Sequence, residues 1–117
     1  MKPTDLMIKD WVMVKVLSQI PNTYVLHTWA ANDYSRNLQV KPIPLTTEIL
    51  EKNGWVYTEY CHEYQDGKII IQSRPPYMWI RINGIHIEDF KCEYVHQYQH
   101  LLRLCGLNEL ANNFKVV

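Results

Sequence analysis

The first third of the chain alternates apolar and polar positions in a way that predicts β-strands. Over residues 10–17 the valines occupy every second position, which is the period of a strand with one buried face. A second strand is expected over residues 24–29, and the turn-forming residues Pro21 and Asn22 lie between the two. These segments predict an antiparallel hairpin, to which residues 38–40 can add a short third strand.

Two prolines, Pro42 and Pro44, separate this region from the rest of the chain. Each proline fixes its own φ and lacks an amide donor, so neither a helix nor a central strand is expected to continue through them. A short helix is expected directly afterwards, with Thr46 as its N-cap and Lys52 near its end. Gly54 can supply the left-handed residue that stops it. A helix of about two turns is unstable alone, so we expect it to pack on a sheet.

The second half of the chain predicts an antiparallel meander. Aromatic and β-branched residues are concentrated over residues 55–64, which favours one long strand there. The pair Asp66-Gly67 then predicts a tight turn into a strand that begins at Ile69. Further strands are expected over residues 78–82 and 85–87, with the turn pair Asn83-Gly84 between them.

The last element predicted is a helix over residues 94–104, where apolar residues recur at helical spacing. His96 and His100 lie four residues apart on it, and Glu93 precedes them, so the three side chains are candidates for one metal ion. The glutamate of the zinc-protease signature His-Glu-x-x-His is missing between the histidines. We therefore interpret this side of the helix as a solvated polar face, formed by His96, Gln97, Gln99, His100 and Arg103.

These elements predict a single α+β domain over residues 1–117, a length that can bury roughly two-thirds of the unfolded surface. Its first part, about residues 5–41, is expected to be a barrel-like antiparallel sheet. The remainder, about residues 42–110, is expected to hold the short central helix, the antiparallel meander and a C-terminal helix packed across that meander.

The charge balance narrows the classes of function. Twelve Lys and Arg residues against twelve Asp and Glu residues give a net charge of zero, so the overall positive field that favours nucleic-acid binding is missing. No apolar run approaches the ~18 residues of a membrane span, and no signal peptide is recognisable, so we expect a cytoplasmic protein with no membrane partner. Three cysteines without a Cys-x-x-Cys pair predict free thiols.

One strand nevertheless carries a candidate binding surface. Tyr77, Trp79 and Arg81 alternate with the apolar residues of that strand, so they are expected to share its second face. Aromatic rings with a guanidinium are a platform on which single-stranded nucleic acid or a peptide can stack. The full candidate surface consists of Tyr77, Trp79, Arg81, Lys68 and Arg74, and its alternative is coverage by the C-terminal helix.

Three separated stretches, DLMIKDWV over residues 5–12, PIPLTTEIL over residues 42–50 and YVHQYQHLL over residues 94–102, carry a resemblance. Together with Asn53-Gly54-Trp55 they resemble a family of small uncharacterised proteins of prophage and mobile-element regions in gut Bacteroidetes. In that family a glycine usually stands where this chain has Lys9, and an acidic residue commonly stands where it has Thr47. The resemblance implies a bacterial, phage-derived setting and transfers no catalytic residue.

No nucleophile motif, phosphate-binding glycine loop or dinucleotide fingerprint occurs in the chain, so no catalytic residue, cofactor or metal is predicted. We expect a non-enzymatic, phage-associated accessory or interaction module that binds an unknown protein partner or a second copy of itself. Trp11 and Trp29 are candidates for such a contact or for burial. The alternative is a nucleic-acid-binding module that uses the aromatic and basic strand face.

Overall fold

The computed structural model describes residues 1–58, 61–64, 69–74, 77–82, 85–90 and 92–117. The chain divides into two compact units. Unit 1 comprises Met1–Pro44 with Tyr94–Phe114, and unit 2 comprises Leu45–Glu93 with Lys115–Val117. The predicted turns at Asp66-Gly67 and Asn83-Gly84 lie outside the described residues.

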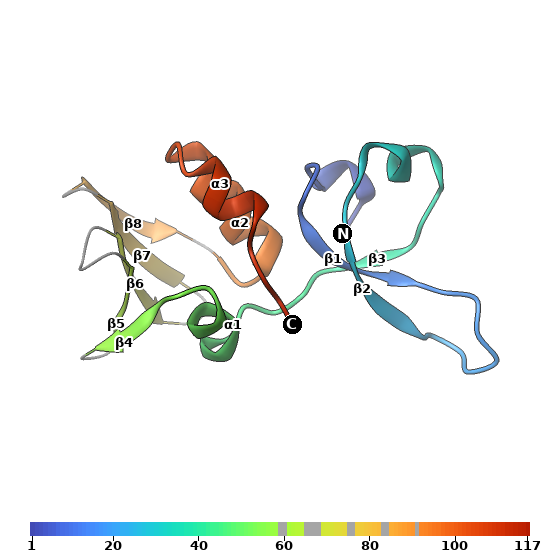
Figure 1. The fold of residues 1–117 in the computed structure, drawn as a ribbon, viewed down its shortest axis with the longest axis horizontal. Helices are drawn as coiled ribbons and strands as arrows, with labels where there is room; N and C mark the ends of the chain where they lie inside the picture. Colours follow the sequence, from blue (N-terminus) through green and yellow to red (C-terminus); the bar gives the residue numbers. More distant parts are fainter. Residues whose placement is uncertain (59–60, 65–68, 75–76, 83–84, 91) are drawn as a thin grey trace. The chain divides into compact units, whose positions relative to one another are not determined.

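The sheet of unit 1 contains β1 (Trp11–Lys15), β2 (Tyr24–Thr28) and β3 (Val40–Lys41) in the order β2-β1-β3 (Figure 1). Both pairings are antiparallel, which confirms the predicted hairpin and the short third strand. The α+β class is likewise confirmed, but the described residues of this unit form an open three-stranded sheet and show no closed barrel.

Unit 1 also holds two 3₁₀ helices, η1 (Pro3–Asp5) and η2 (Ala31–Ser35), and two α-helices, α2 (Val95–Leu104) and α3 (Asn108–Asn112). The predicted C-terminal helix is α2, and Gly106 follows it with φ 79°. This helix was expected to belong with the meander, but it is part of unit 1, where it contacts β1 and α3. The buried apolar residues of the unit include Leu6, Val12, Trp29, Tyr98 and Leu102.

Unit 2 begins with α1 (Thr47–Lys52), which confirms the short helix predicted after the prolines. The hydroxyl of Thr46 accepts a hydrogen bond from the Ile49 amide at 3.2 Å, as an N-cap does. Gly54 has φ 87°, the left-handed conformation that ends a helix. Ile49 and Leu50 supply the buried side of α1.

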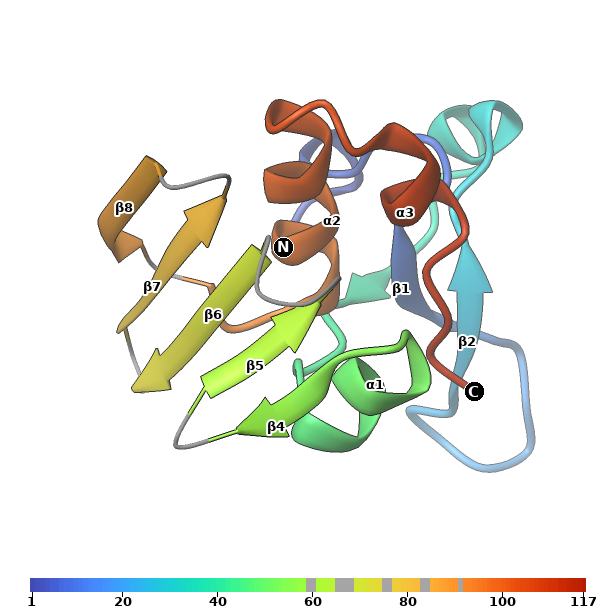
Figure 2. The same ribbon diagram turned by 60° about the vertical axis from the view of Figure 1, so that its left-hand side comes forward.

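The sheet of unit 2 contains β4 (Val56–Thr58), β5 (Cys61–Tyr64), β6 (Ile69–Arg74), β7 (Tyr77–Ile82) and β8 (Ile85–Phe90) in sequential order (Figure 2). Neighbouring strands are antiparallel, so the predicted meander is confirmed. The single long strand expected over residues 55–64 was wrong, because β4 and β5 pair with each other. Strand-forming composition identifies extended chain but not the position where it reverses.

Candidate functional site

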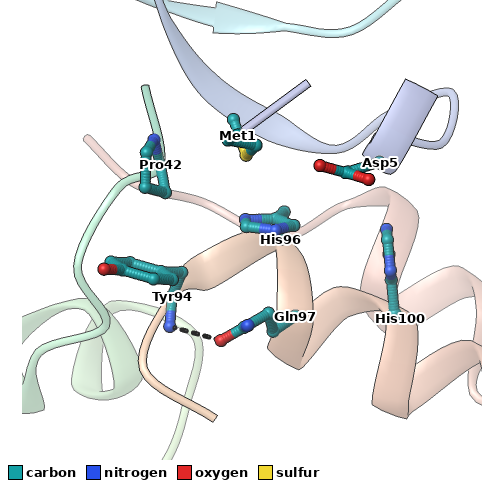
Figure 3. Close-up of a pocket in the computed structure, with 7 residues that line it drawn as sticks. All are labelled: Met1, Asp5, Pro42, Tyr94, His96, Gln97 and His100. Atoms are coloured by element: carbon teal, nitrogen blue, oxygen red, sulfur yellow. Dashed lines mark hydrogen bonds between the residues drawn. The ribbon is translucent and has the colours of Figure 1, made fainter. Parts of the chain in front are cut away.

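A pocket of about 500 Å³ lies in unit 1 beside the first turns of α2 (Figure 3). Its walls come from three parts of the unit: the N-terminal segment, the chain that follows β3, and α2. We call it the histidine pocket because two histidines line it. The lining residues are Met1, Asp5, Pro42, Tyr94, His96, Gln97 and His100.

The ring of His100 forms a hydrogen bond with the buried carboxylate of Asp10. Asp10 has 0% of its surface exposed, and its Oδ2 lies 2.5 Å from Nε2 of His100. The other oxygen, Oδ1, lies 2.5 Å from Nη1 of Arg103, and the Met7 amide donates to Oδ2 at 2.8 Å. Asp10 bonds to Nε2 of His100, so the other ring nitrogen, Nδ1, takes no part in this contact. The Asp10 cluster, defined as Asp10, His100 and Arg103, thus fixes the orientation of one pocket wall.

His96 is the more deeply buried histidine, with 6% of its surface exposed. Its ring stacks on Tyr94 at a centroid distance of 6.1 Å and meets His100 edge-on at 5.7 Å. Its Nδ1 is buried and has no hydrogen-bond partner among the described residues. Burial, followed by the neighbouring charge of His100, lowers the pKa of His96, while Asp10 and Asp5 act in the opposite direction. The pocket therefore presents a neutral imidazole at pH 7.

The side chain of Gln99, on the same helix, forms hydrogen bonds with backbone groups of the segment that enters β1 and of α3. This fully buried side chain accepts a hydrogen bond from the Trp11 amide at 2.8 Å. Its amide nitrogen donates to the carbonyl oxygens of Lys9 and Ala111, each at 2.9 Å. The prediction of a solvated polar face was therefore wrong, because Gln99, His100 and Arg103 hydrogen-bond to other parts of unit 1 and the ring of His96 is buried.

A second buried aspartate in unit 1 has the same kinds of partner. Oδ2 of Asp33 lies 2.7 Å from Nε2 of His27 and accepts the Ala30 amide at 2.8 Å. Its Oδ1 lies 3.0 Å from Nη1 of Arg36. We call Asp33, His27 and Arg36 the Asp33 cluster. Burial alone raises the pKa of Asp33, but the hydrogen bonds from His27, the Ala30 amide and Arg36 outweigh it, so the pKa is lowered.

The predicted surface on β7 is described only in part. Arg81 is exposed and pairs across the sheet with Ile70, and the backbone register pairs Arg74 with Tyr77 and Gln72 with Trp79. The side chains of Arg74, Tyr77 and Trp79 are not described, and Lys68 lies outside the described residues.

The described residues give little material for metal or thiol chemistry. Among them, no three His, Cys, Asp or Glu side chains are grouped closely enough to hold a metal ion. Burial raises the pKa of the Cys92 thiol to about 12, which disfavours a thiolate there.

The two tryptophans that were candidates for a partner contact or for burial both take part in contacts within unit 1. Trp29 is buried, and the half-buried Trp11 donates from Nε1 to the Phe114 carbonyl at 2.5 Å.

Comparison with known proteins leaves the family open. No protein-family model, no curated protein and no solved structure matches the chain. None of the helices in the described part of the chain has the length and apolar character needed to span a membrane. Function is therefore inferred from the geometry of unit 1.

Proposed function

We propose that this chain is a small, non-enzymatic interaction module of phage-associated origin, and that its histidine pocket takes up a basic side chain of a partner protein. The observation that supports this most is the buried His96, whose pKa burial lowers, in the wall of a pocket that also holds a carboxylate. A cavity of about 500 Å³ is of the size that binds small groups in proteins.

The pocket offers the carboxylate of Asp5 and hydrogen-bond acceptors, together with donor groups of Tyr94 and Gln97 and the positively charged amino group of Met1. Asp5 is exposed, and one of its oxygens accepts the Lys2 amide at 2.9 Å, which leaves further lone pairs for a ligand. The neutral ring of His96 adds acceptor capacity. A guanidinium or ammonium group complements this set because it carries positive charge and only donors.

The aromatic wall supports the same ligand class. Figure 3 shows His96 between the ring of Tyr94 and the carboxylate of Asp5. A cation that lies over an aromatic face gains about 0.5 to 2 kcal/mol, more when water is excluded. Pro42 and Met1 contribute apolar surface against which the alkyl stem of lysine or arginine can pack.

A nuclear magnetic resonance titration tests this proposal with three small probes: N-acetyl-arginine amide, N-acetyl-lysine amide and the neutral N-acetyl-glutamine amide. We expect the two cationic probes to shift the backbone amide signals of His96, Gln97 and His100. Asp5→Asn is expected to abolish the response, whereas Glu109→Gln, which removes an exposed carboxylate of α3, is expected to leave it unchanged. Equal shifts with the neutral probe, or none with any probe, would contradict the proposal.

A second candidate function is nucleic-acid binding through the β6 and β7 strands. The observation that favours it is the exposed guanidinium of Arg81, on a strand whose register also pairs Arg74 with Tyr77. Half-buried Glu63 pairs with Ile70 on the adjacent strand and places a carboxylate two strands from Arg81. Fluorescence anisotropy with single-stranded oligonucleotides tests this function. It requires binding that weakens with salt and is lost in Trp79→Ala and Arg81→Ala.

A further inference from the structure

The outer strand of the unit 1 sheet is unusually apolar for an edge. Among the described residues β2 pairs with β1 only, and Val25 and Leu26 on it are 44% and 40% exposed. Leu17 and Ile20, in the connection between the two strands, are exposed as well. Natural edge strands are usually protected by charges, prolines or bulges, because an open edge is a template for another strand.

The register shows which backbone groups of β2 face outward. The Trp29 amide donates to the Asp10 carbonyl at 2.8 Å, and the Val16 amide donates to the Thr23 carbonyl at 2.9 Å. Hydrogen-bonding direction alternates along an antiparallel strand, so Val25 and His27 also direct their backbone groups toward β1. The backbone N–H and C=O groups of Tyr24, Leu26 and Thr28 therefore face the open edge.

We propose that β2 pairs with β2 of a second copy of this chain, antiparallel and around a two-fold axis at Leu26. This goes beyond the function proposed for the histidine pocket. In this register Leu26 lies opposite Leu26 of the second copy, and Tyr24 lies opposite Thr28. The residues that face each other as hydrogen-bonded pairs are then the three whose backbone groups point outward. The resulting sheet has six strands, in the order β3-β1-β2-β2-β1-β3.

The side chains of β2 fit this symmetric arrangement. The strand, Tyr24-Val25-Leu26-His27-Thr28, contains no Lys, Arg, Asp or Glu, so pairing with itself opposes no like charges. Its one titratable imidazole, His27, is held by Asp33 within the same copy. A two-fold interface must be self-complementary, and the apolar Leu26 pair on the axis, with Val25 opposite His27 on either side of it, meets that condition. A foreign strand would have to match the same edge without this built-in symmetry.

Analytical ultracentrifugation of the whole chain tests the proposal over a concentration series from micromolar to millimolar. We expect a reversible monomer–dimer equilibrium. Leu26→Lys is expected to shift it to monomer, because two ammonium groups would face each other across the axis. Leu104→Lys makes the same substitution at an exposed position of α2 and is expected to leave the equilibrium unchanged. A monomer at all concentrations would overturn the proposal, as would a dimer that Leu26→Lys leaves intact.

Hydrogen exchange of the unaltered chain, resolved by residue, gives a readout that does not depend on a variant folding. The amides of Val25 and His27 bond within the hairpin and are expected to be protected at every concentration. The amides of Tyr24, Leu26 and Thr28 are expected to gain protection only as the dimer forms. Dimer formation without this alternating gain would place the interface elsewhere and overturn the proposal.

Discussion

The Asp10 cluster and the Asp33 cluster of unit 1 use the same chemistry at different ranges along the chain. In each, a buried carboxylate binds one histidine, one arginine and the backbone amide three residues before it. The partners of Asp33 lie six and three residues away, whereas His100 and Arg103 lie 90 and 93 residues from Asp10. The Asp33 cluster therefore fixes a local segment, and the Asp10 cluster fixes α2 against the chain that enters β1.

Exposure separates the clusters further. Arg103 is 13% exposed and Arg36 is 58% exposed at the side chain. An exposed ion pair contributes little because water and salt screen it, whereas a broken buried pair leaves an uncompensated charge in a region of low dielectric. The same three residue types are therefore expected to contribute different amounts to the free energy of unfolding in the two clusters. The buried Asp10 cluster also orients His100, a wall of the histidine pocket.

The largest expected difference between the clusters is at the aspartates. Asp10→Asn is expected to lower the free energy of unfolding by about 3 to 5 kcal/mol, since it leaves the nearly buried Arg103 without its carboxylate. Asp33→Asn is expected to cost about 1 to 2 kcal/mol, because its partners can turn to water. Urea denaturation followed by circular dichroism measures both. An equal or larger loss at Asp33 would contradict the difference drawn between the two clusters.

The arginines give a smaller, matched comparison. Arg103→Met is expected to destabilise the chain by about 1 to 3 kcal/mol, because it removes a charged partner of buried Asp10. Arg36→Met is expected to change stability by about 0.5 kcal/mol or less, since that guanidinium is mostly solvated. The same denaturation experiment compares them. If both substitutions have the same effect, burial does not distinguish the two clusters.

The histidine pocket and the Asp33 cluster are expected to lose their contributions to stability in different pH ranges as the solution is acidified. Because the pKa of His96 is lowered in the folded chain, the unfolded chain binds more protons, and stability is lost as the pH falls below the ordinary histidine value of about 6.5. The pKa of Asp33 is also lowered, so its contribution persists until the pH falls through the acidic range below about 3.9.

His96→Phe tests that window, because it keeps an aromatic ring beside Tyr94 and removes the titrating group. Stability measured between pH 7 and pH 5 is expected to fall less in this variant than in the unaltered chain. His62 in unit 2, whose pKa burial also lowers, is expected to contribute part of the pH dependence that remains. A variant with an unchanged pH profile would contradict the assignment to His96.

The one substitution expected to stabilise the chain is at the residue before Asp10. Lys9 has φ 76°, a left-handed conformation that glycine adopts without a steric penalty. Its backbone bonds to Trp29 and Gln99 do not require a side chain. Lys9→Gly is therefore expected to raise the free energy of unfolding by about 1 kcal/mol. Destabilisation by thermal or urea denaturation would show that the lysine side chain does more than occupy this turn.

Local signals in the sequence predicted much of the fold. The alternating valines predicted β1, the proline pair and Thr46 predicted the start of α1, and helical spacing predicted α2. These features are set by residues within one element, so a short window of sequence contains them. The split of β4 from β5 was missed because strand-forming residues continue on both sides of it.

The histidine pocket could be predicted only in its parts. The spacing of His96 and His100 was visible, but their polar neighbours indicated solvent exposure. What overturns that interpretation is Asp10, whose pairing with residues 90 positions away leaves no local signal. Gln99 illustrates the same limit, because a buried glutamine and an exposed one look alike until their backbone partners are known.

The central claim is that the histidine pocket binds a basic side chain through neutral imidazole and carboxylate groups. Long-range nitrogen–proton spectra of the histidine rings at pH 7, recorded with and without N-acetyl-arginine amide, test it most directly. We predict that His96 is neutral and that its ring nitrogen signals move on addition of the probe, with no such movement in Asp5→Asn. A protonated His96, or ring signals that do not respond to the probe, would contradict it.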